Sequence, residues 1–227
     1  MGKDKLRKFA EVSEMDHVLE PSHDEMLHGS ERLRGHWHRE IFRNENPITL
    51  ELACGKGEYT IALAERYKER NHIGVDIKGN RIWRGAKTSK ETGMNNVAFL
   101  RTHIESIDSF FAKNEVDEIW ITFPDPQKKS RREKKRLTHP LFLNRYRNIL
   151  RPGGTVNLKT DSSTLYDYTM DVILEQSLKV HHQCIDIYNL GRIKFPDDLN
   201  ELMETKTHYE QMWLDEGKQI KFISFEL

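Results

Sequence analysis

The stretch ELACGKGEYT, residues 51–60, joins an apolar run to a segment with helical spacing. The run ITLELAC (48–54) predicts a strand, and the apolar residues of YTIALAERY (59–67) recur at helical intervals. Between them, Gly55 and Gly57 permit a tight turn and the close approach of a ligand to the backbone. A strand, a glycine turn and a helix form the first unit of nucleotide-binding α/β folds, so this stretch decides the fold class.

The same alternation of strands and helices continues along the rest of the chain. Further strands are expected at 71–77, 96–102, 117–123 and 155–160, and helices at 81–93, 140–150 and 163–176. The segments 180–188 and 218–227 alternate polar and apolar residues and are expected to close the sheet. The sequence therefore predicts a doubly wound α/β fold, with a mostly parallel seven-stranded sheet and helices on both faces.

Composition limits the kinds of protein that this chain can be. Its 227 residues suit one domain with a short extension, and we expect an N-terminal extension, partly helical or mobile, over 1–46. Because 36 basic residues balance 36 acidic ones, any attraction to nucleic acid must be local. Cys54 and Cys184 are too few for a disulfide framework and lack metal-site spacing, which favours a reduced cytoplasmic protein. No secretory signal and no membrane-spanning run is expected.

Four of the predicted strands end in polar or glycine residues. Gly55 and Gly57 follow the first strand, Asp76 the second, Asp125 the fourth and Asp161 the fifth. Ligands of doubly wound folds bind beyond the carboxyl ends of the parallel strands. We therefore expect these residues to converge at one edge of the sheet.

The charge pattern around the glycine turn indicates which ligand is bound there. Asp76 follows Gly57 at roughly the 20-residue distance of a ribose-binding acid. Thr60 stands where a dinucleotide fingerprint has a third small residue, and the charge of Glu51 disfavours a pyrophosphate. A carboxylate suits the ammonium and sulfonium of S-adenosylmethionine, which we favour over a nicotinamide cofactor. The alternative is a glycine turn in an ordinary α/β protein.

Asp125 is the candidate for the reacting region. Pro124 and Pro126 on either side restrict the backbone and hence the positions of its carboxylate. The tract KKSRREKKR (128–136) follows with seven cations against one acid. Bound phosphates would relieve the repulsion among these cations, so we interpret the tract as a clamp for a nucleic-acid backbone. The alternatives are a plain strand-ending turn and a solvated or nuclear-localisation-like basic face.

Taken together, these segments resemble the bacterial, single-chain tRNA (guanine-N7)-methyltransferases. The resemblance runs from about Leu50 to Glu210 and rests on ELACGKGEYT, GVDIK, FPDPQKKSRREKKRL, LRPGG, LKTD and TKTHYE. It implies a Rossmann-like class I methyltransferase fold over 47–227, S-adenosylmethionine as cofactor and tRNA as substrate. Gln127 and Lys128 stand where the family usually has Trp-Pro, and Ala53 replaces a common glycine.

The resemblance also implies roles for single residues. The implied cofactor-binding residues are Glu51 for the methionine part, Gly55 and Gly57 in the turn, Asp76 for the ribose, His103 with Glu105 nearby for the adenine, and Asp125 beside the methyl transfer. The implied substrate-binding residues are Lys129 for the tRNA, and Asp161, Thr207 and Glu210 for the target guanosine at position 46 of the variable loop. Thr207 and Glu210 also have the spacing of a capping box.

The function favoured by these observations is methyl transfer to N7 of guanine in tRNA, with Asp125 as the catalytic residue. The alternatives are a methyltransferase acting on another RNA and a non-catalytic RNA-binding protein on the same fold. We expect no metal, because His36 and His38 have no third ligand nearby in the sequence. The four tryptophans are expected in the core or at hinges, with Trp37, between two arginines, an alternative RNA contact.

Overall fold

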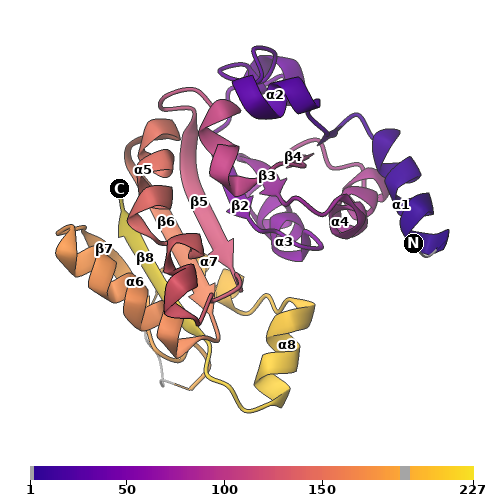
Figure 1. Ribbon diagram of the computed structural model, residues 1–227. Coiled ribbons are helices and arrows are strands. Elements are labelled where there is room, and N and C mark those ends of the chain that lie inside the picture. Colours follow the sequence, from indigo (N-terminus) through magenta and orange to yellow (C-terminus); the bar gives the residue numbers. More distant parts are fainter. Residues whose placement is uncertain (1–2, 190–194) are drawn as a thin grey trace.

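The computed structural model describes residues 3–189 and 195–227, which build a single twisted sheet with helices on both faces (Figure 1). The sheet has eight strands in the order β1-β4-β3-β2-β5-β6-β8-β7. The strands are β1 (Val18–Leu19), β2 (Ile48–Leu52), β3 (Asn71–Val75), β4 (Val97–Leu100), β5 (Val116–Thr122), β6 (Leu150–Thr160), β7 (Val180–Cys184) and β8 (Lys221–Glu226).

Strand β2 lies at the point where the strand order reverses. Leu50 of β2 is in register with Ile73 of β3 on one side and with Ile119 of β5 on the other, both in parallel. The chain thus builds outward from β2 to β4 and then returns to add β5 and β6 on the opposite side. The crevice beyond the carboxyl ends of β2 and β5 is the place where doubly wound folds bind ligands.

The last two strands, β7 and β8, complete the sheet, and β8 runs antiparallel to both of its neighbours. Strand β8 inserts between β6 and β7, with Leu158 opposite Ile223 and Cys184 opposite Phe222. The doubly wound α/β fold is confirmed. The predicted number of seven strands is one too few, because Val18 and Leu19 add the short strand β1 beside β4. Two residues without alternating neighbours give no strand pattern in the sequence.

Eleven helical segments connect and flank these strands in the described ranges. They are α1 (Lys3–Ser13), α2 (His23–His28), the π-helix η1 (Trp37–Phe42), α3 (Glu58–Arg66), α4 (Gly79–Glu91), the 3₁₀ segments η2 (Ile104–Ser109) and η3 (Ser130–Lys135), α5 (Pro140–Ile149), α6 (Ser163–Glu175), α7 (Asp197–Met203) and α8 (His208–Asp215). None of the helices in the described part is long and apolar enough to cross a membrane.

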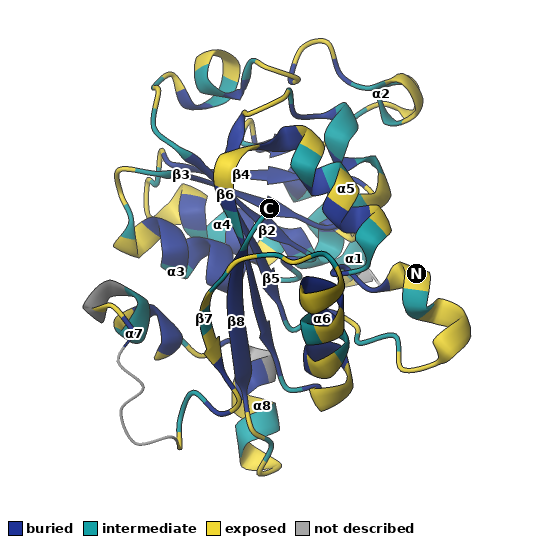
Figure 2. Ribbon diagram, turned by 90° about the vertical axis from the view of Figure 1, so that its left-hand side faces the viewer, coloured by how far each residue is buried: buried dark blue, intermediate teal, exposed yellow. Residues whose placement is uncertain are grey.

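Alternating side chains of the strands divide the core into two layers. Ile119 and Ile121 of β5 pack with α5, α6 and the 33–42 segment, whereas Trp120 between them packs with α3 and α7 on the other face. A third cluster joins α1 and α4 to the strand residue Phe99. Figure 2 shows the sheet buried and the outer sides of α6 and α8 exposed. Core side chains therefore pack on both faces of the sheet, and a cavity lined by Glu51 and Thr122 lies at the carboxyl ends of β2 and β5.

The first 46 residues contribute to the sheet and to the core. Helix α1 packs against α4, and β1 extends the sheet. Trp37 of η1 is fully buried, stacks on Phe111 at 5.0 Å between ring centroids, and donates its indole N–H to the carbonyl oxygen of Phe110. This burial excludes Trp37 as an RNA contact in this structure and agrees with its expected place in the core.

Candidate active site

The glycine loop after β2 has the left-handed backbone that its sequence predicts. Gly55 and Gly57 have φ values of +57° and +70°. At Gly57 a Cβ atom would lie 2.6 Å from Cε1 of Phe99, so the loop can rest on this ring only without a side chain. Ala53 has a φ of +59° as well, although it has a Cβ atom. This explains why a glycine would be the unstrained choice at position 53.

Asp76 fixes this loop from the end of the neighbouring strand β3. One of its carboxylate oxygens accepts the backbone N–H of Gly55 at 3.1 Å, and the other accepts that of Lys78 at 2.8 Å. The residue is buried but still lines a cavity at the carboxyl edge. Asp76 therefore holds the loop in its conformation and also places its carboxylate where a ligand in the cavity can bind it.

Glu51 lies at the base of the same loop and is almost completely buried. The hydroxyl groups of Thr60 on α3 and Thr122 on β5 donate hydrogen bonds to its two carboxylate oxygens. Burial disfavours the ionised form and raises the pKa of Glu51 to about 7, an effect that the two hydroxyl groups only partly offset. Burial removes the water that would solvate the ionised carboxylate of Glu51. A cationic ligand beside this carboxylate would therefore stabilise its ionised form.

A cavity of about 280 Å³ lies beside Asp76. Its polar lining residues include Asp76, Thr102, His103, Glu105 and Asp125, and its apolar lining residues include Ile77, Ile104, Leu137 and Phe142. An apolar lining with several polar groups suits a purine attached to a ribose.

The Thr102 hydroxyl oxygen is buried in this cavity wall and has no hydrogen-bond partner among the described residues. A buried polar atom of this kind in a cavity wall is available to hydrogen-bond a ligand. His103 and Glu105 are both exposed, so Thr102 is the more enclosed polar group at the end of β4. No role was predicted for Thr102 from the sequence; its place as the last residue of the predicted strand 96–102 was the available signal. The residues present therefore fit the adenosine part of S-adenosylmethionine.

A smaller cavity of about 80 Å³ continues past the glycine loop toward Glu51. Gly55, Tyr59, Thr122 and Thr207 are among its lining residues. Thr207 was expected at the guanosine, but the structure places it on this side, beside the glycine loop. The cavity leads from the loop to the buried carboxylate and so fits the methionine part of the cofactor.

Asp125 lies on the loop that follows β5 and separates two cavities. Its carboxylate accepts the backbone N–H of Gln127 at 2.9 Å, which closes a tight turn, and Phe123 and Gln127 both have φ values of +47°. Together with Pro124, Asp125 lines the 280 Å³ cavity and also a second, larger one of about 780 Å³. The two cavities therefore meet at the Pro124–Asp125 wall.

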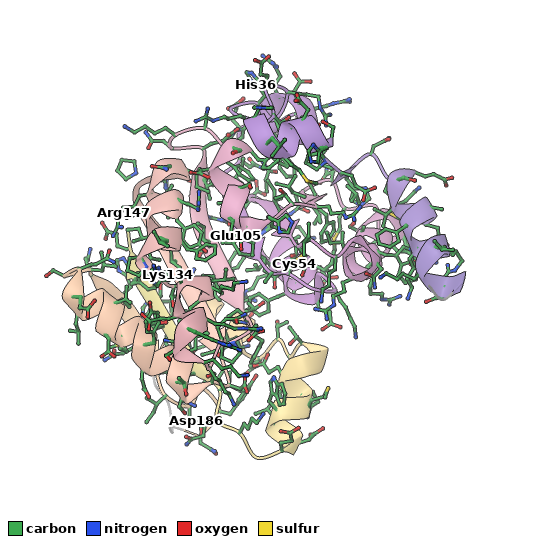
Figure 3. The ribbon with its side chains drawn as sticks, in the orientation of Figure 1. His36, Cys54, Glu105, Lys134, Arg147 and Asp186 are labelled. Carbon is green, nitrogen blue, oxygen red and sulfur yellow. The ribbon has the colours of Figure 1, made fainter. Side chains whose placement is uncertain are left out.

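The larger cavity combines carboxylates, cations and an indole ring. Its lining residues include Lys78, Arg81, Asp125, Lys128, Asp161, Trp213 and Lys218. Lys129, expected to contact tRNA, is exposed at the start of η3, whereas its neighbour Lys128 lines the cavity. The basic tract and the glycine loop thus lie on the same side of the molecule. Figure 3 shows Lys134 of the tract in the same central region as Glu105 and Cys54.

Glu210 has a different environment from the one expected for a guanosine ligand. Its carboxylate is fully buried, lies 2.8 Å from the ammonium of Lys159, and accepts the Tyr188 hydroxyl at 2.8 Å. The expected capping box is confirmed, because Thr207 and Glu210 exchange side-chain and backbone hydrogen bonds at the start of α8. Burial lowers the pKa of Lys159, and the nearby Glu210 opposes this shift. The carboxylate therefore holds the chain in place instead of facing a cavity.

Metal-ligating residues are not grouped in the described ranges: no three His, Cys, Asp or Glu side chains there could hold one ion. Cys54 and Cys184 are both buried, free thiols. Of the tryptophans, Trp37 and Trp120 are core residues, and Trp83 packs partly buried against the cluster of α1 and α4. Trp213 is partly buried and lines the larger cavity, so it is not a core residue.

Comparison with known proteins agrees with this arrangement. A family model described as "Putative methyltransferase" matches residues 45–223. A tRNA (guanine-N(7)-)-methyltransferase of Bacteroides fragilis is 47% identical over all of this chain and 87% of its own length. The protein of that name from Christiangramia forsetii is 46% identical, over 100% of this chain and 99% of its own. A third, from Porphyromonas gingivalis, is 52% identical over 86% of this chain and 77% of its own.

Among solved structures, a 16S rRNA methyltransferase, KamB, aligns with a TM-score of 0.62 over 92% of this chain and 95% of that chain. Its sequence identity of 13% supports the fold alone. The curated relatives cover nearly the whole chain at much higher identity, and the matched segment contains every strand from β2 onward except the last residues of β8. The chain belongs to the tRNA (guanine-N7)-methyltransferase family.

Proposed function

We propose that this protein transfers a methyl group from S-adenosylmethionine to N7 of guanine at position 46 in the variable loop of tRNA, in the cytoplasm. The observation that carries this proposal is the Pro124–Asp125 wall, which borders both the cofactor-sized cavity and the larger cavity. Groups held in the two cavities therefore lie next to each other along this wall. Family membership supports the choice of donor and acceptor.

The residues around the glycine loop would hold the donor. Asp76 would accept hydrogen bonds from ribose hydroxyl groups, and the Thr102 hydroxyl would bond the adenine. Glu51 would neutralise the cationic methionine part from below the loop, because the partners of its buried carboxylate, the Thr122 hydroxyl and the hydroxyl and backbone N–H of Thr60, carry no charge. S-adenosylmethionine supplies a sulfonium-bound methyl group as the electrophile.

Guanine N7 carries a free lone pair, so no proton must be removed before attack. The residues of the larger cavity therefore need to orient the base more than to activate it, with N7 in line at roughly 3 Å. Positive charge moves onto the guanine ring during transfer, and the fixed carboxylates of Asp125 and Asp161 stabilise it there. Asp161 also suits the guanine N1–H and N2–H₂ donors, which adenine lacks in that arrangement.

Cations from two segments that line the larger cavity would position the tRNA. Lys128 begins the basic tract, and Lys78 and Arg81 come from the N-cap and first turn of α4. Lysine and arginine contacts to phosphates position a nucleic acid but do not read its sequence. We therefore assign guanine selection to Asp161 and backbone binding to these cations, together with Lys129 on the exposed tract.

The test is incubation with labelled S-adenosylmethionine and tRNA, followed by nucleoside analysis. We expect 7-methylguanosine from wild-type tRNA, none from a tRNA with adenosine at position 46, and a severe loss with the Asp125→Ala or Asp161→Ala variant. Product on the altered tRNA would point to another acceptor. Cofactor binding by calorimetry without any methylated product would leave an RNA-binding protein as the better description.

A further inference from the structure

The C-terminal end of α8 brings an indole and an ammonium together in the larger cavity. Gly217 follows the helix with a φ of +72°, and the backbone N–H of Lys218 returns to the carbonyl oxygen of Trp213 at 2.9 Å. These features form a Schellman motif, which fixes the residue after the glycine beside the last helical turn. The position of the Lys218 side chain over Trp213 is thus set by the local fold of the chain.

The Lys218 ammonium has three neighbours in this position. It lies 3.3 Å from the centroid of the Trp213 ring, 3.5 Å from Oδ2 of Asp161 and 3.1 Å from Oε2 of Glu216. The first two partners line the larger cavity beside Asp125. The carboxylate assigned to guanine recognition is therefore already paired with a cation of the same chain.

A guanine base can make the same two contacts as this ammonium, one with the Asp161 carboxylate and one with the Trp213 ring. Its N1–H and N2–H₂ groups are donors for a carboxylate, and its flat ring stacks on an aromatic face. We propose that Trp213 is the stacking surface for the acceptor guanine, and that Lys218 occupies the place of the base until tRNA binds. This inference rests on the proposed function and adds residues that recognise the base.

The Lys218 ammonium keeps one ion-pair partner when a guanine base displaces it. Glu216 already lies within ion-pair distance of Lys218 and is half exposed, so the ammonium can keep that contact while it leaves Asp161 and Trp213. No isolated charge is created by the exchange.

The same arrangement favours the reaction and the release of its product. Methylation at N7 places a positive charge on the guanine ring, and an indole face attracts a cation. Trp213 therefore stabilises the methylated ring more than the unreacted base, which affects kcat as well as KM. The nearby Lys218 ammonium repels the charged product, and it forms its ion pair with Asp161 again as the base leaves.

The first test compares variants on α8 in the tRNA methylation assay. We expect Trp213→Ala to lower kcat/KM for tRNA by about 10- to 100-fold, because stacking of one base contributes about 1–3 kcal/mol. Trp213→Phe should restore most of the activity. Met212→Ala is the matched control, since Met212 is 41% exposed on the same helix and does not line the cavity. Cofactor affinity should be the same in all four proteins. If Trp213→Ala stays within about twofold of wild type, the stacking surface is disproved.

The second test concerns Lys218 and uses Lys218→Met, which removes the charge at similar length. If Lys218 is an internal cation that competes with guanine, the Lys218→Met variant should have an unchanged or lower KM for tRNA. The dependence of its KM on salt should also be unchanged. A phosphate-binding lysine predicts a higher KM and a salt dependence reduced by about one counterion. A higher KM would therefore overturn the role given to Lys218.

A binding measurement separates this inference from the proposed function. Titration with 7-methylguanosine monophosphate should quench the tryptophan fluorescence of the wild type, and Trp213→Phe should abolish that quenching. If the wild type methylates no tRNA but the nucleotide still quenches Trp213, the proposed function fails and the stacking surface stands. If the wild type is active and no Trp213-dependent quenching occurs, the stacking surface is overturned.

Discussion

The ammonium of Lys159 lies 2.8 Å from the carboxylate of Glu210, and both side chains are fully buried. Lys159 comes from the carboxyl end of β6 and Glu210 from the first turn of α8. Lys159 also donates to the carbonyl oxygens of Met203 and Thr205, at 3.3 and 3.2 Å. The pair therefore holds against the sheet the segment that contains Thr207, which lines the 80 Å³ cavity.

Loss of one member of this pair should destabilise the protein strongly. Glu210→Gln leaves the Lys159 cation buried without its counter-ion, and we expect the free energy of unfolding to fall by about 3–5 kcal/mol. The double variant Lys159→Met/Glu210→Gln removes both charges and should lose less than the sum of the single variants. Urea unfolding of the four proteins measures these differences. Single variants that lose under about 1 kcal/mol would show that the pair is not needed to hold this segment.

Cofactor affinity should depend on pH through Glu51. Its pKa is raised to about 7 by burial, so below that pH much of the free protein carries a neutral carboxyl group. A cationic ligand favours the ionised form, and affinity should increase as the pH rises toward and through about 7. Calorimetry between pH 5.5 and 8.5 measures this dependence. Glu51→Gln is the control: it should bind weakly and retain only the pH dependence of the ligand itself.

The stability of the ligand-free protein should change with pH in the opposite direction. The pKa of Glu51 is higher in the folded chain than the ordinary value of 4.5 for a solvated glutamate, so the folded state holds the proton more firmly. The stabilisation is fully present below about pH 4.5 and is lost as the pH rises through about 7. At pH 8, Glu51→Gln should be more stable than wild type by roughly 3 kcal/mol. Equal stability at pH 8 would mean that the carboxylate is solvated when ionised.

Thr102→Val should weaken cofactor binding without destabilising the protein. The Thr102 hydroxyl has no partner within the described ranges, so valine of similar shape removes only an unsatisfied polar group. A lost hydrogen bond to the adenosine would lower the affinity by about 2- to 10-fold. Thr102→Ser keeps the hydroxyl and should bind like the wild type. Unchanged affinity in the valine variant would remove Thr102 from the cofactor site.

Ala53→Gly should stabilise the glycine loop. Ala53 has a φ of +59°, a conformation that costs an L-residue with a Cβ atom about 1–2 kcal/mol. Glycine removes this strain but increases the entropy of the unfolded chain, and the net gain should be roughly 0.5–1 kcal/mol. Ala62→Gly in the interior of α3 is the matched control and should lose about 1 kcal/mol. Thermal unfolding compares the two variants, and a loss at both positions would contradict the assignment of strain to Ala53.

The sequence predicted those features that depend on local periodicity. Each strand from β2 onward was expected, since buried strands give apolar runs and their ends carry Asp76, Asp125 and Asp161. The Thr207–Glu210 capping box was also expected from its spacing, because a cap involves only neighbouring residues. Local patterns therefore sufficed for the fold and for the edge at which the site lies.

The remaining features depend on contacts between distant segments. Glu210 looks like any helix-capping acid until Lys159 is brought beside it. The same applies to Lys218, whose pairing with Asp161 joins two segments that are far apart in the chain. No periodic pattern distinguishes Lys128, which lines the larger cavity, from Lys129, which does not.

The shared wall of Pro124 and Asp125 has a consequence for inhibitor chemistry. A compound that joins an adenosine to a guanine must pass over these two residues to fill both cavities at once. A short linker without negative charge suits this crossing, because an anionic one would meet the Asp125 carboxylate. A linker with a single positive charge would instead copy the cation that forms during methyl transfer.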